Sequence, residues 1–215
     1  MSPSDSARVA QSSEPKPEPE IAGWFGKIPA LGDFATRRLP PSFVDAWDAW
    51  LSEELVAAQS VLADAWLPSY QQAPTWCFAL MAGVIDRSRW YGAWIPSFDR
   101  VGRQFPLTIA IGSRSSVVAP QRLWAVFVAT GRRALEPSCG ADCVDACLRE
   151  SLEDQATRAQ FTEPFERSIE STLALAGEGS SLWWPWFDED PTGAAASIFD
   201  GLPRGEDFLK LLHVR

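Results

Sequence analysis

The chain has 215 residues and a formal net charge of −9, so it can build one substantial core, and its field repels polyphosphate and anionic lipid. We therefore expect no nucleic-acid partner. The longest uncharged apolar run, residues 76–85, is about half of the roughly 20 residues that a membrane-spanning helix needs, so we expect no membrane insertion. The only histidine, His213, excludes histidine-based triads and multi-histidine metal sites.

The N-terminal residues 1–20 are rich in Ser, Pro and Glu, and residues 12–20 read SSEPKPEPE. Such a composition cannot bury apolar surface, so we expect a disordered tail, followed by one globular domain over residues 21–215. The tail has neither the basic start nor the apolar core of a secretory signal, so we expect a cytoplasmic protein.

The globular part begins with a predicted strand at residues 24–28, which runs into a turn. Ser42 and Asp45 form a variant of the capping box, and apolar residues then repeat at helical spacing as far as Leu55, which predicts a helix. A second helical piece follows, and we expect it to stop at Pro68.

Three strands are predicted next, at residues 76–81, 90–95 and 107–111. The first is short and continuously apolar, which is typical of a strand covered on both faces, so we expect helices on both sides of the sheet. A polar turn at residues 86–89 separates the first two strands and predicts a hairpin.

The last part of the chain is predicted to be mainly helical. In chain order we expect three helices around residues 123–128, 144–152 and 165–173, a strand at residues 181–186, and a closing helix at residues 208–212. Pro185 confines the late strand to an edge or an end, and Pro203 is expected in the first turn of the closing helix.

Three cysteines, Cys139, Cys143 and Cys147, lie four residues apart. On one helix they would share a face and point the same way, which is poor disulfide geometry, so we expect reduced thiols. Their spacing fits neither zinc sites nor iron–sulfur clusters, and we expect no metal and instead a buried helix edge.

The most informative stretch is a loop at residues 96–106, PSFDRVGRQFP, which sets charges amid apolar sequence. A buried carboxylate or guanidinium must be paired and hydrogen-bonded, so the charged side chains of the loop pair either with one another or with a bound partner. We favour a structural role for Asp99 and Arg103. Arg100, which is expected to face away from them, is the better candidate for contact with a partner.

Residues 26–34 superficially resemble a phosphate-binding loop, because they follow a predicted strand and contain two glycines and Lys27. A Walker loop places Lys and Ser or Thr directly after its final glycine, whereas here Asp33 occupies that place and would repel phosphate. We therefore expect a tight turn and no nucleotide or other cofactor.

Several motifs together resemble the TagF (ImpM) family associated with bacterial type VI secretion. In chain order they are GWFGKIPALGDF at residues 23–34, RLP at 38–40, WDAWL at 47–51, PSFDRVGRQFPLT at 96–108, SLWW at 181–184 and GLP at 201–203. The resemblance spans roughly residues 21–213. It implies a three-layer arrangement of helices around a sheet, and with the strands above we expect an α/β fold, a three-layer αβα sandwich with a mixed, partly antiparallel central sheet.

The same resemblance implies a cytoplasmic accessory protein that represses type VI secretion after translation by binding the forkhead-associated scaffold protein Fha. The resemblance supplies no established catalytic residues, so we expect that the protein is not an enzyme. The candidate partner-binding or structural residues are Lys27, Asp33, Arg38, Asp99, Arg100 and Arg103.

The alternative is a small-ligand-binding protein or an enzyme, with a pocket around Asp33, Asp99 and Arg103. A homodimer is a further hypothesis, because indole rings are favoured in interfaces. Its candidate residues are Trp183, Trp184 and Trp186.

Overall fold

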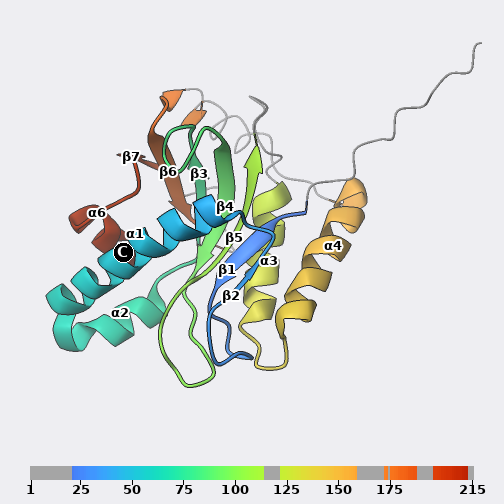
Figure 1. Ribbon diagram of the computed structural model, residues 1–215, viewed down its shortest axis with the longest axis horizontal. Helices are drawn as coiled ribbons and strands as arrows, with labels where there is room; N and C mark the ends of the chain where they lie inside the picture. Colours follow the sequence, from blue (N-terminus) through green and yellow to red (C-terminus); the bar gives the residue numbers. More distant parts are fainter. Residues whose placement is uncertain (1–20, 114–121, 159–171, 174, 188–195, 213–215) are drawn as a thin grey trace, which may run out of the picture.

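The computed structural model describes residues 21–113, 122–158, 172–173, 175–187 and 196–212 (Figure 1). The strands are β1 (Gly23–Gly26), β2 (Ala35–Arg37), β3 (Trp76–Leu80), β4 (Arg89–Ile95), β5 (Leu107–Ser113), β6 (Ser180–Pro185) and β7 (Ser197–Asp200). The helices are α1 (Pro41–Leu62), α2 (Trp66–Gln72), α3 (Arg122–Ala134), α4 (Ala141–Arg158) and α6 (Glu206–Leu212). The α/β class is therefore confirmed.

The seven strands form one sheet in the order β2-β1-β5-β4-β3-β6-β7, and every neighbouring pair runs antiparallel. The expectation of a mixed sheet was wrong. Hairpin-like connections join β1 to β2, β3 to β4 and β4 to β5, and short connections of this kind can only link antiparallel neighbours. The two pairs that are distant in sequence, β1 with β5 and β3 with β6, also meet antiparallel.

Both faces of the sheet are covered by helices. On β3, Trp76, Phe78 and Leu80 belong to the core beneath α1, α2 and α6. Cys77 and Ala79 point to the opposite core, which α3 and α4 cover. All five residues of the strand are buried, as the continuous apolar sequence predicts for a strand with two covered faces.

Trp183 and Trp184 lie inside this core and not at an interface, so that prediction was wrong for both. Trp183 is fully buried, stacks on Trp47 with the ring planes 6° apart, and donates its indole N–H to Ser181 Oγ at 3.0 Å. Trp184 packs edge-on against Trp124 on the other face. They fill opposite faces because neighbouring strand residues alternate. Only Trp186 is partly exposed.

Two helix starts differ from expectation because of proline. Helix α1 begins at Pro41 with Pro40 as its N-cap and no side-chain cap, so Ser42 does not form the predicted capping box. Proline suits the first turn because its φ is already helical and the turn has no partner for its missing N–H. For the same reason Pro68 does not stop a helix and lies in the first turn of α2.

The late elements were predicted in part. Strand β6 pairs with both β3 and β7, so it is interior, and Pro185 is its last residue. Strand β7 was not predicted, and Pro203 precedes α6 instead of lying in its first turn. The helix expected at residues 165–173 falls almost entirely outside the described residues, as do His213 and residues 1–20.

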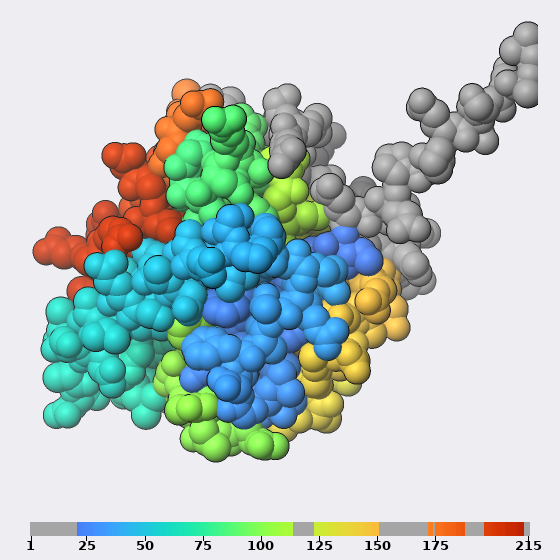
Figure 2. All heavy atoms as spheres, viewed as in Figure 1, coloured from blue at the N-terminus to red at the C-terminus, as the bar shows by residue number. Residues whose placement is uncertain are grey.

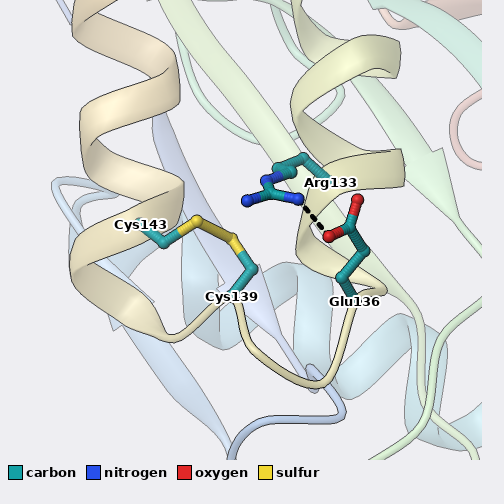
Figure 3. Close-up of a disulfide and its surroundings, with 4 residues drawn as sticks. All are labelled: Arg133, Glu136, Cys139 and Cys143. Carbon is teal, nitrogen blue, oxygen red and sulfur yellow. Dashed lines mark hydrogen bonds and ion pairs between the residues drawn. A yellow bond between two sulfur atoms is a disulfide. The ribbon is translucent and has the colours of Figure 1, made fainter.

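Cys139 and Cys143 form a disulfide, so the expectation of reduced thiols was wrong for this pair (Figure 3). The premise that both lie on one helix fails, because α4 begins only at Ala141 and Cys139 belongs to the turn before it. That turn brings the two Cα atoms to 5.2 Å, within the usual range for a disulfide. Cys77 and Cys147 are free.

Candidate functional site

Two loops meet at the end of the sheet where β1 and β4 finish. We call residues 27–34, between β1 and β2, the first loop, and residues 96–106, between β4 and β5, the charged loop. Arg100 N–H donates to Leu31 O at 2.8 Å, and Arg103 Nη2 donates to Gly32 O at 2.7 Å. The two loops therefore form one surface, visible at the lower end of the molecule in blue and yellow-green (Figure 2).

The charged loop is a small hairpin-like turn. Phe98 and Gln104 pair across it, and Asp99 N–H donates to Arg103 O at 3.1 Å. Gly102 sits at the tip with φ of 84°, a conformation that glycine adopts without strain. At its far end the loop passes so close to Gly26 that a Cβ there would lie 2.0 Å from Pro106 O.

The inner side of the charged loop, which faces the interior of the protein, is organised around the carboxylate of Asp99. Its side chain is fully buried, and Oδ2 lies 2.6 Å from Arg103 Nε and 3.1 Å from Lys27 Nζ. Oδ1 accepts the backbone N–H groups of Val101 at 3.0 Å and Arg103 at 2.9 Å. Both carboxylate oxygens are thus occupied by groups of the chain itself.

These partners determine the charge state of Asp99. Burial disfavours the ionised carboxylate, but the hydrogen bonds from Arg103, Lys27 and Val101 outweigh it and hold the pKa of Asp99 well below its usual range. The group is therefore a permanent anion near neutral pH and a poor proton acceptor. Such a carboxylate is suited to holding a loop in shape and unsuited to general-base chemistry.

The start of the charged loop is anchored to the helical face of the sheet. Tyr70 of α2 donates its hydroxyl to Ser97 O at 2.9 Å and accepts Ser97 N–H at 3.1 Å. Ser97 Oγ donates to Lys27 O at 2.7 Å, which ties the same residue to the first loop. Burial raises the pKa of the Tyr70 hydroxyl far above its usual value, so it remains a neutral hydrogen-bonding group.

The outer side of the charged loop is different. Arg100 is exposed, and its guanidinium makes no hydrogen bond or ion pair with any part of the chain that the structure describes. Val101 beside it is 70% exposed and Phe98 is 39% exposed. On the first loop, Phe34 is 45% exposed and lies beneath Lys27 Nζ, 4.8 Å from the ring centre.

The structure places Arg38 in another region. Its Nη2 lies 2.8 Å from Asp145 Oδ1 on α4, and its Nε donates to Ala22 O at 3.0 Å. Trp24 Nε1 donates to the same Asp145 oxygen at 2.9 Å. Although burial opposes ionisation, the hydrogen bonds from Arg38 and Trp24 and the charge of Arg37 lower the pKa of Asp145. This second ion pair, in which Asp145 is buried and Arg38 is exposed, fastens α4 to the edge of the sheet.

Asp33 also lies outside the Asp99 centre. It is exposed on the first loop, and its Oδ1 accepts the N–H of Phe34 at 2.8 Å. The ligand pocket expected around Asp33, Asp99 and Arg103 is therefore not assembled. A cavity of about 630 Å³ lies elsewhere, lined by residues that include Arg38, Asp86 and Trp90.

Within the described ranges, no group of three or more His, Cys, Asp or Glu side chains could hold a metal ion. Residues 188–190, an acidic run, lie outside those ranges. No helix in the described part of the chain has the length and apolar character needed to cross a membrane.

Sequence reasoning missed the partners that complete these centres. Asp145 pairs with Arg38 across 107 residues of chain, and no local pattern links them. Tyr70 joins Ser97 from a helix 27 residues away. The one general signal lies with Asp145, because a buried carboxylate requires a cation somewhere in the fold.

The comparisons with known proteins agree with this architecture. The profile of the TagF N-terminal domain, type VI secretion system-associated, matches residues 23–167. The crystal structure of PA0076 from Pseudomonas aeruginosa PAO1, at 2.05 Å resolution, is similar over 89% of this chain and 93% of that chain, with 28% sequence identity and a TM-score of 0.70. No curated protein sequence matches. The chain therefore belongs to the TagF family of type VI secretion system-associated proteins.

Proposed function

We propose that this protein is a non-catalytic, cytoplasmic repressor that acts on type VI secretion after translation by binding the forkhead-associated scaffold Fha. Membership of the TagF family supports the link with type VI secretion. The charged loop lies within the matched residues, which makes it a reasonable place to look for the binding surface.

The observation that carries the proposal is the contrast within that loop. Asp99 has both oxygens occupied by Lys27, Arg103 and backbone N–H groups, so it has no free acceptor for a reacting ligand. Arg100, on the outer side, has an exposed guanidinium. A rigid loop that offers an exposed cation beside exposed apolar side chains suits recognition of another protein better than catalysis.

Two measurements test the proposal. Purified full-length protein, mixed with the purified scaffold encoded in the same secretion cluster, should form a complex in size-exclusion chromatography. In the source bacterium, deleting the gene should raise type VI secretion and overproducing the protein should lower it, with the level of the secretion components unchanged. Absence of a complex together with unchanged secretion would contradict the proposal.

A further inference from the structure

A groove of about 300 Å³ lies between α1, α2 and the charged loop. Its walls are mainly apolar and come from all three elements: Leu55 and Val56 of α1, Trp66 of α2, and Phe105 of the charged loop. The volume is at the lower end of the roughly 300–1,000 Å³ typical of small-molecule sites, and the groove is open to solvent. It therefore suits a few side chains of another protein better than a buried ligand.

Exposed apolar side chains lie on two of the elements that form this groove. Val56, on its α1 wall, is 65% exposed, although it lies beside the buried core of the domain. Phe98 and Val101 are exposed on the charged loop, which contributes Gln104 and Phe105 to the opposite wall. Isolated exposed apolar residues are common, but an exposed apolar residue in the wall of an apolar groove is typical of an interaction surface.

Gln104 lines the groove from the charged loop, and its side chain is held in place because Nε2 donates to Gly102 O at 2.9 Å. Its Oε1 is buried and accepts no hydrogen bond from the described residues. A bound segment therefore meets the apolar part of this wall, and the Gln104 oxygen is closed to it.

The charged loop, which forms one wall of the groove, has a charge opposite to that of the whole protein. The chain has 28 acidic residues, yet none of the residues lining the groove is acidic. The charged loop instead presents Arg100 and Arg103, whose side chain is 59% exposed. Arg103 is already paired with Asp99, whereas Arg100 has no ion-pair partner among the described residues. The surface is complementary to acidic side chains.

We propose that this groove, together with the tip of the charged loop, binds a linear segment of a partner protein in which acidic residues flank apolar ones. The apolar side chains enter between Val56 and Phe105, and a carboxylate pairs with Arg100. Where the partner is the scaffold, the inference rests on the proposed function and specifies which surface and which kind of scaffold segment meet.

The first test is site-specific photo-crosslinking of the full chain with purified scaffold. The photoreactive amino acid p-benzoylphenylalanine replaces Val56 or, as a matched control, Val61. Both valines are on α1 and they are similarly exposed, at 65% and 67%, but only Val56 lines the groove. We expect a crosslink at position 56, mapped by mass spectrometry to an acidic and apolar scaffold segment, and none at position 61.

The second test measures affinity with matched pairs of variants. V56E should weaken scaffold binding about tenfold or more, because a carboxylate then enters an apolar contact, while V61E leaves it unchanged. R100E should weaken binding about tenfold and reduce its dependence on salt. R87E is the control, because Arg87 is exposed in the turn at the opposite end of β4. Melting temperatures verify that each variant is folded.

The outcomes separate this inference from the proposed function. If the scaffold binds and neither V56E nor R100E weakens it, the inference is wrong and the proposed function stands. If the scaffold does not bind at all, the same crosslinking in cells of the source bacterium decides. A crosslinked acidic and apolar segment whose synthetic peptide binds the native chain, but not V56E, supports the inference. A crosslink to residues 1–20, a crosslink to a second copy, or no crosslink at position 56 overturns it.

Discussion

The two sides of the charged loop differ in how completely their polar groups are satisfied. On the inner side, Asp99 is fully buried and receives four contacts from Lys27, Val101 and Arg103. On the outer side, Arg100 is exposed, and its guanidinium has no partner among the described residues. The difference supports the proposal that one short loop combines two roles, since the closed side fixes the geometry of the open side.

Replacing Asp99 with Ala should produce the largest loss of stability. The change strands Lys27, whose side chain is only 7% exposed, and removes the acceptor of two backbone N–H groups. Breaking a buried ion pair in this way costs about 3–5 kcal/mol. Urea unfolding followed by tryptophan fluorescence measures it.

Asp33→Ala is the control for that experiment, because Asp33 lies on the adjoining loop but is exposed. Among the described residues its carboxylate accepts only the N–H of its neighbour Phe34. It should cost no more than about 1 kcal/mol. Equal losses for the two variants would show that the inner side of the loop is not a closed ionic centre.

Reducing the Cys139–Cys143 disulfide should lower the free energy of unfolding by about 2 kcal/mol, since it closes only a short loop. The disulfide lies at the start of α4 (Figure 3), and neither cysteine lines the groove or belongs to the charged loop. Urea unfolding with and without dithiothreitol measures the change. Scaffold affinity should be the same in both conditions, and a lowered affinity would place the partner surface near α4.

Acid should weaken the inner side of the charged loop. Asp99 has a lower pKa in the folded chain than the value of about 3.9 in unfolded chains, so its stabilisation is complete above that value and is lost as the pH falls below it. At pH 3 the loss amounts to about 1 kcal/mol. Asp145 adds a loss of the same sign, because its pKa is also lowered. The D99N variant should show a shallower fall in urea stability between pH 5 and pH 3 than the native protein. An identical fall would contradict this assignment.

Arg100→Ala should have the smallest effect on stability, within about 0.5 kcal/mol of the native protein, because its guanidinium makes no described hydrogen bond or ion pair. Arg87→Ala is the matched control. Differential scanning fluorimetry compares the two. A clear drop in melting temperature for Arg100→Ala alone would assign this residue to the inner, structural side.

The sequence allowed the parts of the fold that local pattern determines to be predicted. The apolar run at residues 76–81 marked a strand with two covered faces, and the cost of burying charge pointed to an Asp99–Arg103 pair, which the structure contains at 2.6 Å. Strand direction in the sheet, in contrast, depends on how distant segments such as β1 and β5 meet, and no local pattern encodes that.

Contacts between residues that are distant in the chain could not be predicted from the sequence either. Lys27 completes the Asp99 centre from a separate loop, and Asp145 reaches Arg38 from α4. Trp183 was mistaken for an interface residue because a large indole is favoured both in cores and in interfaces, and only the packing distinguishes them. The groove depends on the meeting of α1, α2 and the charged loop, which no single motif contains.

The central claim is that the outer side of the charged loop binds the partner while the inner side holds the loop in shape. The most direct test is a calorimetric titration of purified scaffold into Arg100→Ala beside the native protein, with both confirmed to melt at the same temperature. We predict that the affinity falls about tenfold in the variant. An unchanged affinity at an unchanged melting temperature would contradict the claim.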